Sequence, residues 1–108
     1  CYPDADLKPF AALPYDAVFL GHTHRVFLRK SGNVLVVNVG SCGMPRDQGD
    51  APTLAVYDTA SGEATVYRLK MDLAPVLEAY GTVHETVRQC LYRQDQEPFG
   101  EWVAEDIA

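Results

Sequence analysis

Short apolar runs alternate with turn residues over the first two thirds of the chain, a pattern that is typical of β-strands. We expect a strand over residues 17–20 and a hairpin over residues 26–38, with Gly and Asn in its turn. The uninterrupted apolar run at residues 34–37 predicts a strand that is buried on both faces. A second hairpin is expected over residues 53–69, because Thr, Val and Tyr favour strands there.

Helical patterns flank these strands. A short helix is expected over residues 7–13, where prolines lie near its start and just after its end. Asp72 is expected to cap a helix over residues 73–80. Thr82 followed by Glu85 forms a capping-box pattern, which predicts a further helix that ends near residue 93.

Two stretches lack a clear period. Residues 39–52 are rich in Gly, Pro, Ser and Asp, which predicts a long loop, and long loops in small domains are often functional. The last residues, with Trp102, Val103 and Ile107, are expected either to form a short amphipathic helix or to fray. The sequence thus predicts a mixed α/β (α+β) unit over residues 1–70 and a helical extension with an acidic tail over residues 71–108.

The composition fits one compact unit. The chain has 108 residues of which 47% are apolar, and no apolar run approaches the roughly 20 residues of a membrane helix, so we expect no membrane association. The net charge of −6 arises largely from residues 95–108, which carry five acidic and no basic side chains. No basic stripe is present, and we therefore expect no non-specific binding of nucleic acid.

The three cysteines, Cys1, Cys42 and Cys90, are an odd number at wide spacing, which argues against a disulfide framework and against a structural zinc knuckle. We expect free thiols, a reducing compartment and hence a cytoplasmic location. The chain opens at Cys1 without a Met or a signal segment, so we expect no secretory leader in these residues and leave open that they are a piece of a longer polypeptide.

The candidate chemistry lies in the tetrapeptide Gly21-His22-Thr23-His24, directly after the first predicted strand. In an extended segment, alternate side chains share one face and lie about 6.6 Å apart. His22 and His24 could then each bind one ion of a two-metal site whose ions lie about 4 Å apart. Gly21 would let the backbone turn at the end of the strand.

An ordered series of motifs resembles the C-terminal half of the calcineurin-like metallophosphoesterases, and most nearly their small bacterial and archaeal phosphodiesterase branch. The similarity covers roughly residues 15–70, and its motifs are Gly21-His22-Thr23-His24, Arg25, the hairpin, Asn38-Val39-Gly40-Ser41 and Pro45-Arg46-Asp47. The resemblance implies a four-layer α/β/β/α sandwich with mixed sheets, of which this chain would form the C-terminal half. It also implies two divalent metal ions, manganese, iron or zinc, with His22 binding one ion and His24 the other.

The sequence departs from the family pattern in two respects. The family's other ligands come earlier in its chain, from an Asp-x-His, a Gly-Asp, a Gly-Asn-His and one further His, and none of these elements precedes Gly21 here. The third histidine, His84, falls in a predicted helix and is expected to be solvated. We therefore expect the chain to be catalytically silent by itself and assign it no catalytic residue. Val39 stands where the family usually has proline.

Two arginines flank the predicted metal loop. Arg25 and Arg46 are candidates for binding phosphate oxygens, because a guanidinium can form paired hydrogen bonds with them. The alternative is a structural ion pair, for instance of Arg46 with Asp47 or Asp50. The residues expected to shape the loop rather than to touch substrate are Gly21, Asn38, Gly40 and Ser41.

The leading hypothesis is a metal-dependent phosphoesterase that hydrolyses a phosphomonoester or phosphodiester with metal-activated water, its substrate being a small phosphate ester. A second hypothesis is a non-catalytic scaffold that binds other proteins, as some relatives of this family do. A third is that the exposed strand edges are completed by a second copy, as a homo-oligomer, or by a missing N-terminal half.

Overall fold

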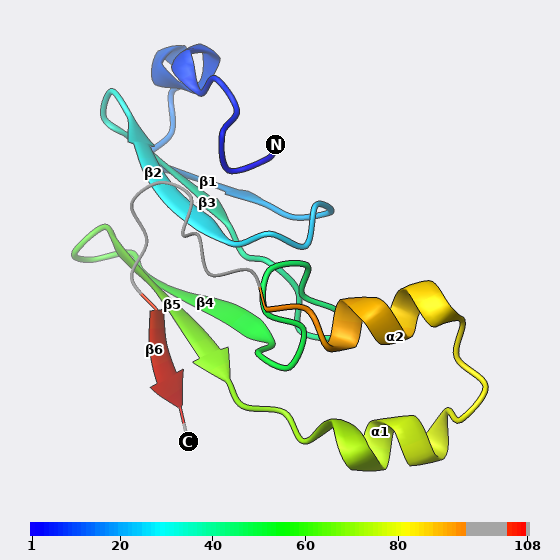
Figure 1. The fold of residues 1–108 in the computed structure, drawn as a ribbon. Coiled ribbons are helices and arrows are strands. Elements are labelled where there is room, and N and C mark those ends of the chain that lie inside the picture. Colours follow the sequence, from blue (N-terminus) through cyan, green and yellow to red (C-terminus); the bar gives the residue numbers. More distant parts are fainter. Residues whose placement is uncertain (95–103, 108) are drawn as a thin grey trace.

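The computed structural model describes residues 1–94 and the strand at residues 104–107. Its elements are two three-stranded sheets, a short 3₁₀-helix and two α-helices (Figure 1). In chain order they are η1 (Lys8–Ala12), β1 (Ala17–Leu20), β2 (Phe27–Ser31), β3 (Val34–Asn38), β4 (Thr53–Asp58), β5 (Glu63–Leu69), α1 (Leu73–Ala79), α2 (Glu85–Leu91) and β6 (Ala104–Ile107).

The first sheet has the order β1-β3-β2, with β3 in the centre. Strand β1 runs parallel to β3, and β2 runs antiparallel to it as the predicted hairpin. All five residues of β3 are buried, which confirms the prediction from its continuous apolar run. The parallel register places Leu20 opposite Asn38, so β1 and β3 end side by side.

The second sheet has the order β4-β5-β6. Strands β4 and β5 form the predicted antiparallel hairpin, and β6 adds a parallel strand to the free edge of β5. The expected terminal helix or frayed end is therefore wrong for residues 104–107, because the open edge of β5 offers unpaired backbone groups that a strand can satisfy. Trp102 and Val103 lie outside the described residues. Both sheets combine parallel and antiparallel pairs, and the α+β class is confirmed.

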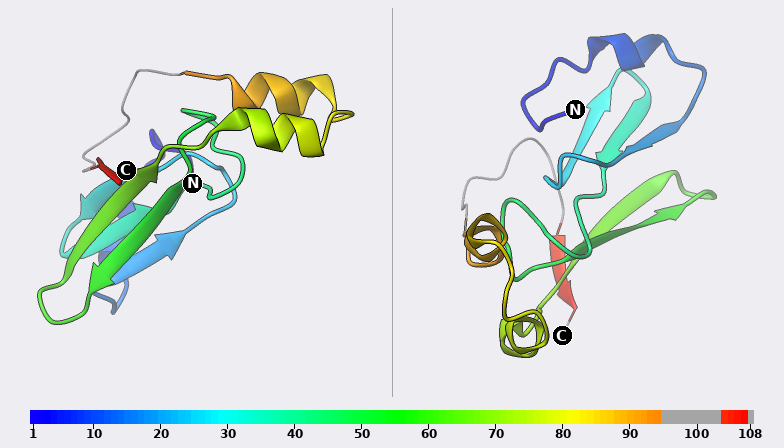
Figure 2. Two further views of the ribbon diagram at one scale, coloured as in Figure 1. Left: turned by 90° about the horizontal axis from the view of Figure 1, so that it is seen from below. Right: turned by 90° about the vertical axis from the view of Figure 1, so that its right-hand side faces the viewer.

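Two apolar clusters lie on opposite faces of the first sheet, since neighbouring residues of β3 point to opposite sides. Val36 packs with Leu7 and Phe27 under the segment that contains η1. Val37 packs with Val26, Leu35 and Val66, and this cluster joins the two sheets face to face (Figure 2). The inner face of the second sheet contributes Ala55, Tyr57, Ala64 and Val66.

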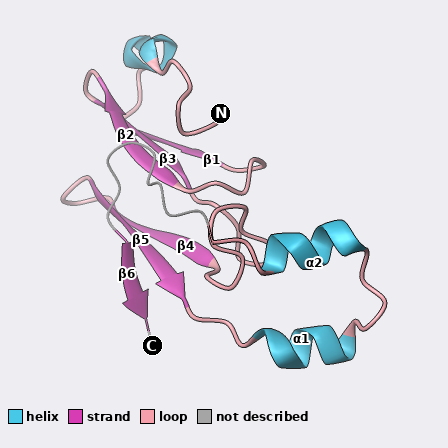
Figure 3. Cartoon of the chain, viewed as in Figure 1, coloured by secondary structure: helices cyan, strands magenta, loops and turns pink. Residues whose placement is uncertain are grey.

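Helices α1 and α2 stand at one end of the sheets and do not cover a face (Figure 3). Asp72 caps α1 as predicted, because its side chain accepts from the Ala74 N–H. The capping box predicted for α2 is wrong. The ring of His84 is the N-cap instead and accepts from the Thr86 N–H at 3.2 Å. None of the helices formed by the described residues has the length and apolar character to traverse a bilayer.

Candidate metal centre

The fold brings the tetrapeptide after β1 next to the long loop after β3. Leu20 pairs with Asn38, and the N–H of Val39 donates to the carbonyl of Leu20 at 3.0 Å. A proline at position 39 could not make this bond, so the departure from the family pattern extends the β1–β3 pairing by one residue. Both candidate loops therefore lie at the same end of the first sheet (Figure 1).

The backbone at the two histidines is not extended. His22 has a φ of 76°, and the Thr23 N–H donates to the Gly21 carbonyl at 3.0 Å, which makes a three-residue γ-turn. His24 has a φ of 60°. The expected strand-like spacing of the two side chains is thus wrong, because the chain leaves the sheet at Gly21 and turns twice. Positive φ at residues other than glycine is strained and clusters at functional sites.

The ring of His24 is held in one orientation. Its Nδ1 lies 2.9 Å from the carbonyl oxygen of Met44, and a carbonyl can only accept, so Nδ1 carries the proton. The lone pair is therefore on Nε2. Metal-binding histidines commonly donate their second ring N–H to a backbone carbonyl in this way. The carbonyl of His24 also accepts from the Arg46 N–H at 2.8 Å, while His22 is exposed.

The side chain of Asn38 holds the histidine turn through hydrogen bonds. It is fully buried, and Nδ2 donates to the hydroxyl of Thr23 at 2.9 Å and to the carbonyl of Cys1 at 3.3 Å. Its Oδ1 accepts from the Gly40 N–H at 3.1 Å. The buried Thr23 lies between the two histidines in sequence, so Asn38 connects the histidine turn to the loop after β3.

Gly40 and Ser41 shape the loop that holds His24. Gly40 has a φ of 75°, and a Cβ at this position would clash with the hydroxyl of Thr53. The Ser41 hydroxyl accepts from the Met44 N–H at 3.0 Å, which orients the segment that ends in the Met44 carbonyl. Thr53 completes the support, because its hydroxyl donates to the carbonyl of Val39 and accepts from the Ser41 N–H.

The two candidate arginines differ in environment. Arg46 is exposed, and its guanidinium makes no hydrogen bond or ion pair with the residues that the structure describes. The alternative of a structural ion pair of Arg46 with Asp47 or Asp50 is not found among the described residues, since Asp47 pairs with Arg68 at 2.5 Å and Asp50 accepts from Gln94. Arg25 is half-buried and directly follows His24.

Sequence reasoning missed three contributors, namely Thr53, Arg68 and the carbonyl of Met44. Of these three, only Arg68 could have been found from the sequence pattern. In β5 it continues the alternation of Ala64 and Val66, which places a charged residue on the inner face of the sheet.

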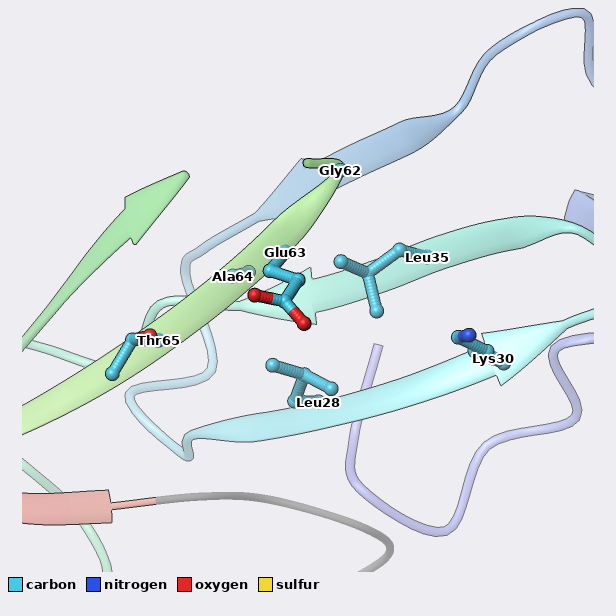
Figure 4. A pocket seen from close by; sticks show the side chains of 7 residues that line it. All are labelled: Leu28, Lys30, Leu35, Gly62, Glu63, Ala64 and Thr65. Atoms are coloured by element: carbon cyan, nitrogen blue, oxygen red, sulfur yellow. The ribbon is translucent and has the colours of Figure 1, made fainter. Parts of the chain in front are cut away.

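The donor set fits only part of a metal site. Within residues 1–94, no three His, Cys, Asp or Glu side chains gather where they could hold a metal ion. Neutral imidazoles suit manganese, iron or zinc, so His22 and His24 fit as two of the ligands. A cavity of about 330 Å³ lies at the other end of the sheets and contains no predicted site residue (Figure 4). It is lined by Leu28, Lys30, Leu35, Gly62, Glu63, Ala64 and Thr65.

Comparison with known proteins gives one family. No curated protein and no solved structure matches the chain. The sequence model of the calcineurin-like phosphoesterase superfamily domain matches residues 4–62, which is more than half of the 108 residues. The match includes η1, the first sheet, both site loops and β4. The chain therefore belongs to the calcineurin-like phosphoesterase superfamily.

Proposed function

We propose that this chain is part of a metal-dependent phosphoesterase in which His22 and His24 bind divalent ions. Membership of the superfamily supports phosphoester hydrolysis as the general activity. One observation carries the finer proposal. The Met44 carbonyl fixes the proton of His24 on Nδ1 and so leaves Nε2 available as a ligand, two residues from an exposed second imidazole.

Manganese, iron or zinc would be held by His22 and His24. The chemistry that such ions supply when bound is neutralisation of phosphate charge and activation of water at neutral pH. The protein's own part is to orient the ligands and the substrate. The backbone N–H of Arg46 donates to the carbonyl of His24, so the side chain of Arg46 begins beside a proposed metal ligand. Its exposed guanidinium would donate hydrogen bonds to phosphate oxygens. Arg25 is the second candidate for this role.

Two imidazoles cannot hold a pair of ions rigidly. We propose that the remaining ligands come from polypeptide outside these 108 residues and that the 108-residue chain alone has no turnover. A phosphomonoester or phosphodiester of a small molecule is the proposed substrate.

A metal-independent scaffold that binds other proteins is the second candidate function. One observation favours it, namely that the described residues bring together no third metal-binding side chain. In this case His22 and His24 would have a structural role in the turn and would bind no metal ion.

Hydrolysis of bis(4-nitrophenyl) phosphate with added manganese separates the two functions. The assay uses the polypeptide encoded by the complete reading frame that contains these residues, and compares it with the 108-residue chain. We expect turnover by the former, lowered by more than about 100-fold in His22→Ala and His24→Ala. The matched control is His84→Asn, which retains a capping side chain at α2 and should keep full activity. Equal turnover in all three variants would refute the proposed roles of His22 and His24, and no turnover in any protein would support the scaffold.

A further inference from the structure

A largely buried ion pair anchors the loop that orients His24. Nη2 of Arg68 donates to Oδ2 of Asp47 at 2.5 Å, and the two side chains are only 6% and 15% exposed. Oδ1 of Asp47 also accepts from the Gln48 N–H at 2.8 Å. The pair joins the loop after β3 to the inner face of the second sheet, although 21 residues separate the two side chains in sequence.

A short segment of chain and two hydrogen bonds connect this pair to His24. Asp47 directly follows Arg46, whose N–H donates to the His24 carbonyl, and it lies three residues after Met44, whose carbonyl accepts from the His24 ring. Between them Pro45 is fully buried and has a fixed φ. Movement of Asp47 would therefore be transmitted to the Met44 carbonyl through a stiff segment.

The second sheet holds this loop at two points. Arg68 holds Asp47, and its register partner on β4, Thr53, bonds to Val39 and Ser41 at the start of the loop. His24 itself extends from β1 of the first sheet. The orientation of His24 thus depends on two neighbouring residues of the opposite sheet.

We propose that Asp47 and Arg68 are positioning residues for His24. By fixing residues 44–47 they keep the Met44 carbonyl on Nδ1 and present Nε2 to the metal ion. The importance of Nε2 for metal rests on the proposed function, whereas the control of the ring by the ion pair does not. A largely buried ion pair is weak evidence for added stability, so the role that we propose for this pair is to fix the geometry of the loop.

The experiment follows the tautomer of His24 in the metal-free 108-residue chain. Histidine ring nitrogens are labelled with ¹⁵N and observed by NMR at about pH 8.5, where imidazoles of ordinary pKa are neutral. His24→Gln assigns the signal. In the unaltered chain the His24 ring should show a single tautomer with the proton on Nδ1. In Asp47→Asn the ring should become a mixture of both tautomers, because the Met44 carbonyl is no longer fixed. Arg68→Lys, which keeps the charge, should retain more of the Nδ1–H form than Asp47→Asn.

The matched control is Val66→Ala, which removes buried methyl groups from the same strand and leaves residues 44–47 and their hydrogen bonds untouched. It should lower the melting temperature and leave the His24 tautomer unchanged. If Asp47→Asn lowers the melting temperature but leaves the tautomer as in Val66→Ala, the ion pair is structural only and the proposal is overturned. If Asp47→Asn does not fold, Arg68→Gln, which removes the charge, decides, and an unchanged tautomer in that variant overturns the proposal. Added manganese tests the proposed function separately, because the tautomer is measured without metal.

Discussion

At the level of single residues, the histidine turn combines strain with support. His22 and His24 have positive φ values of 76° and 60°, which are unfavourable for residues with a Cβ. The buried amide of Asn38 and the Met44 carbonyl hold this turn in place. Such strain persists only when several neighbouring contacts hold the backbone in one conformation. We therefore expect the backbone that carries the two imidazoles to be rigid.

Replacing His22 tests this strain. At a φ of 76°, His22→Gly should be more stable than His22→Ala by about 1 kcal/mol, because glycine has no Cβ to clash. At the exposed helical position Gln89 the order should reverse, with Gly about 1 kcal/mol less stable than Ala. Urea denaturation of the four variants measures both differences. The same order at both positions would show that the turn is unstrained.

Two glycines distinguish the cost of a positive φ from the cost of a steric clash. Gly40 and Gly62 have φ values of 75° and 74°, but a Cβ at residue 40 would clash with Thr53 whereas nothing lies within 4 Å at residue 62. Gly62→Ala should lower the free energy of unfolding by about 1 kcal/mol, and Gly40→Ala by about 3 kcal/mol or more because overpacking is added. Chemical denaturation checks this. Equal losses would mean that Thr53 does not pack against residue 40 in solution.

The sequence alone predicted which residues occupy the site loops but not how the loops are held. Gly21, Asn38, Gly40 and Ser41 follow from the order of the motifs. The contact of Arg68 with Asp47 could not be predicted in this way. It joins the loop after β3 to the second sheet, and the distance between them depends on how the two sheets pack. The positive φ of His22 was also not predictable, since the preceding apolar run favours continuation of the strand.

At the level of elements, local patterns agree with the structure where strands pair with their neighbours in sequence. The strand at Ala17–Leu20 and both hairpins have close to their predicted bounds, because turn residues and apolar runs act within a few residues. Strand β6 and the cap of α2 were missed. The first depends on a strand edge nearly 40 residues away, and the second on a histidine ring used as an acceptor, which is an unusual cap.

The turn of the β4–β5 hairpin contains a carboxylate, that of Asp58, whose pKa is lowered in the folded chain. The N–H groups of Ala60 and Ser61 donate to Asp58, and they hold its pKa below the ordinary 3.8. A lowered pKa in the folded state stabilises the fold above the unfolded pKa, and this contribution disappears as the pH falls through the folded value. We expect stability to decrease below about pH 4.

Asp58→Asn is the matched variant, because it removes the charge and preserves the shape. NMR titration of the Asp58 carboxyl group should give a pKa below 3.8. Below pH 4, the unaltered chain should lose stability more steeply than Asp58→Asn. Parallel stability curves for the two proteins would refute the role of these hydrogen bonds.

At the level of the whole molecule, the contact between the two sheets determines the site. The histidines extend from the first sheet, and the loop that orients His24 is held by the second. The apolar cluster around Val37 and Val66 keeps the two sheets together. The apolar cluster stabilises the contact between the sheets, whereas the contacts of Thr53 and Arg68 with the loop set the geometry of the site.

Two valines test the interface. Val37 is fully buried between the sheets, whereas Val56 on β4 is 53% exposed. Val37→Ala should lower the free energy of unfolding by about 2 kcal/mol, and Val56→Ala by less than about 0.5 kcal/mol. Urea denaturation measures both. Similar losses would show that the sheets do not pack through Val37.

The central claim is that His22 and His24 present their rings to a shared metal centre. The most direct measurement is the NMR spectrum of the ¹⁵N-labelled histidine rings of the 108-residue chain during titration with manganese, which broadens signals near the ion. We predict that the rings of His22 and His24 broaden together at low manganese, while His84 at the N-cap of α2 stays sharp. Equal broadening of all three rings, or broadening of His84 alone, would contradict the claim.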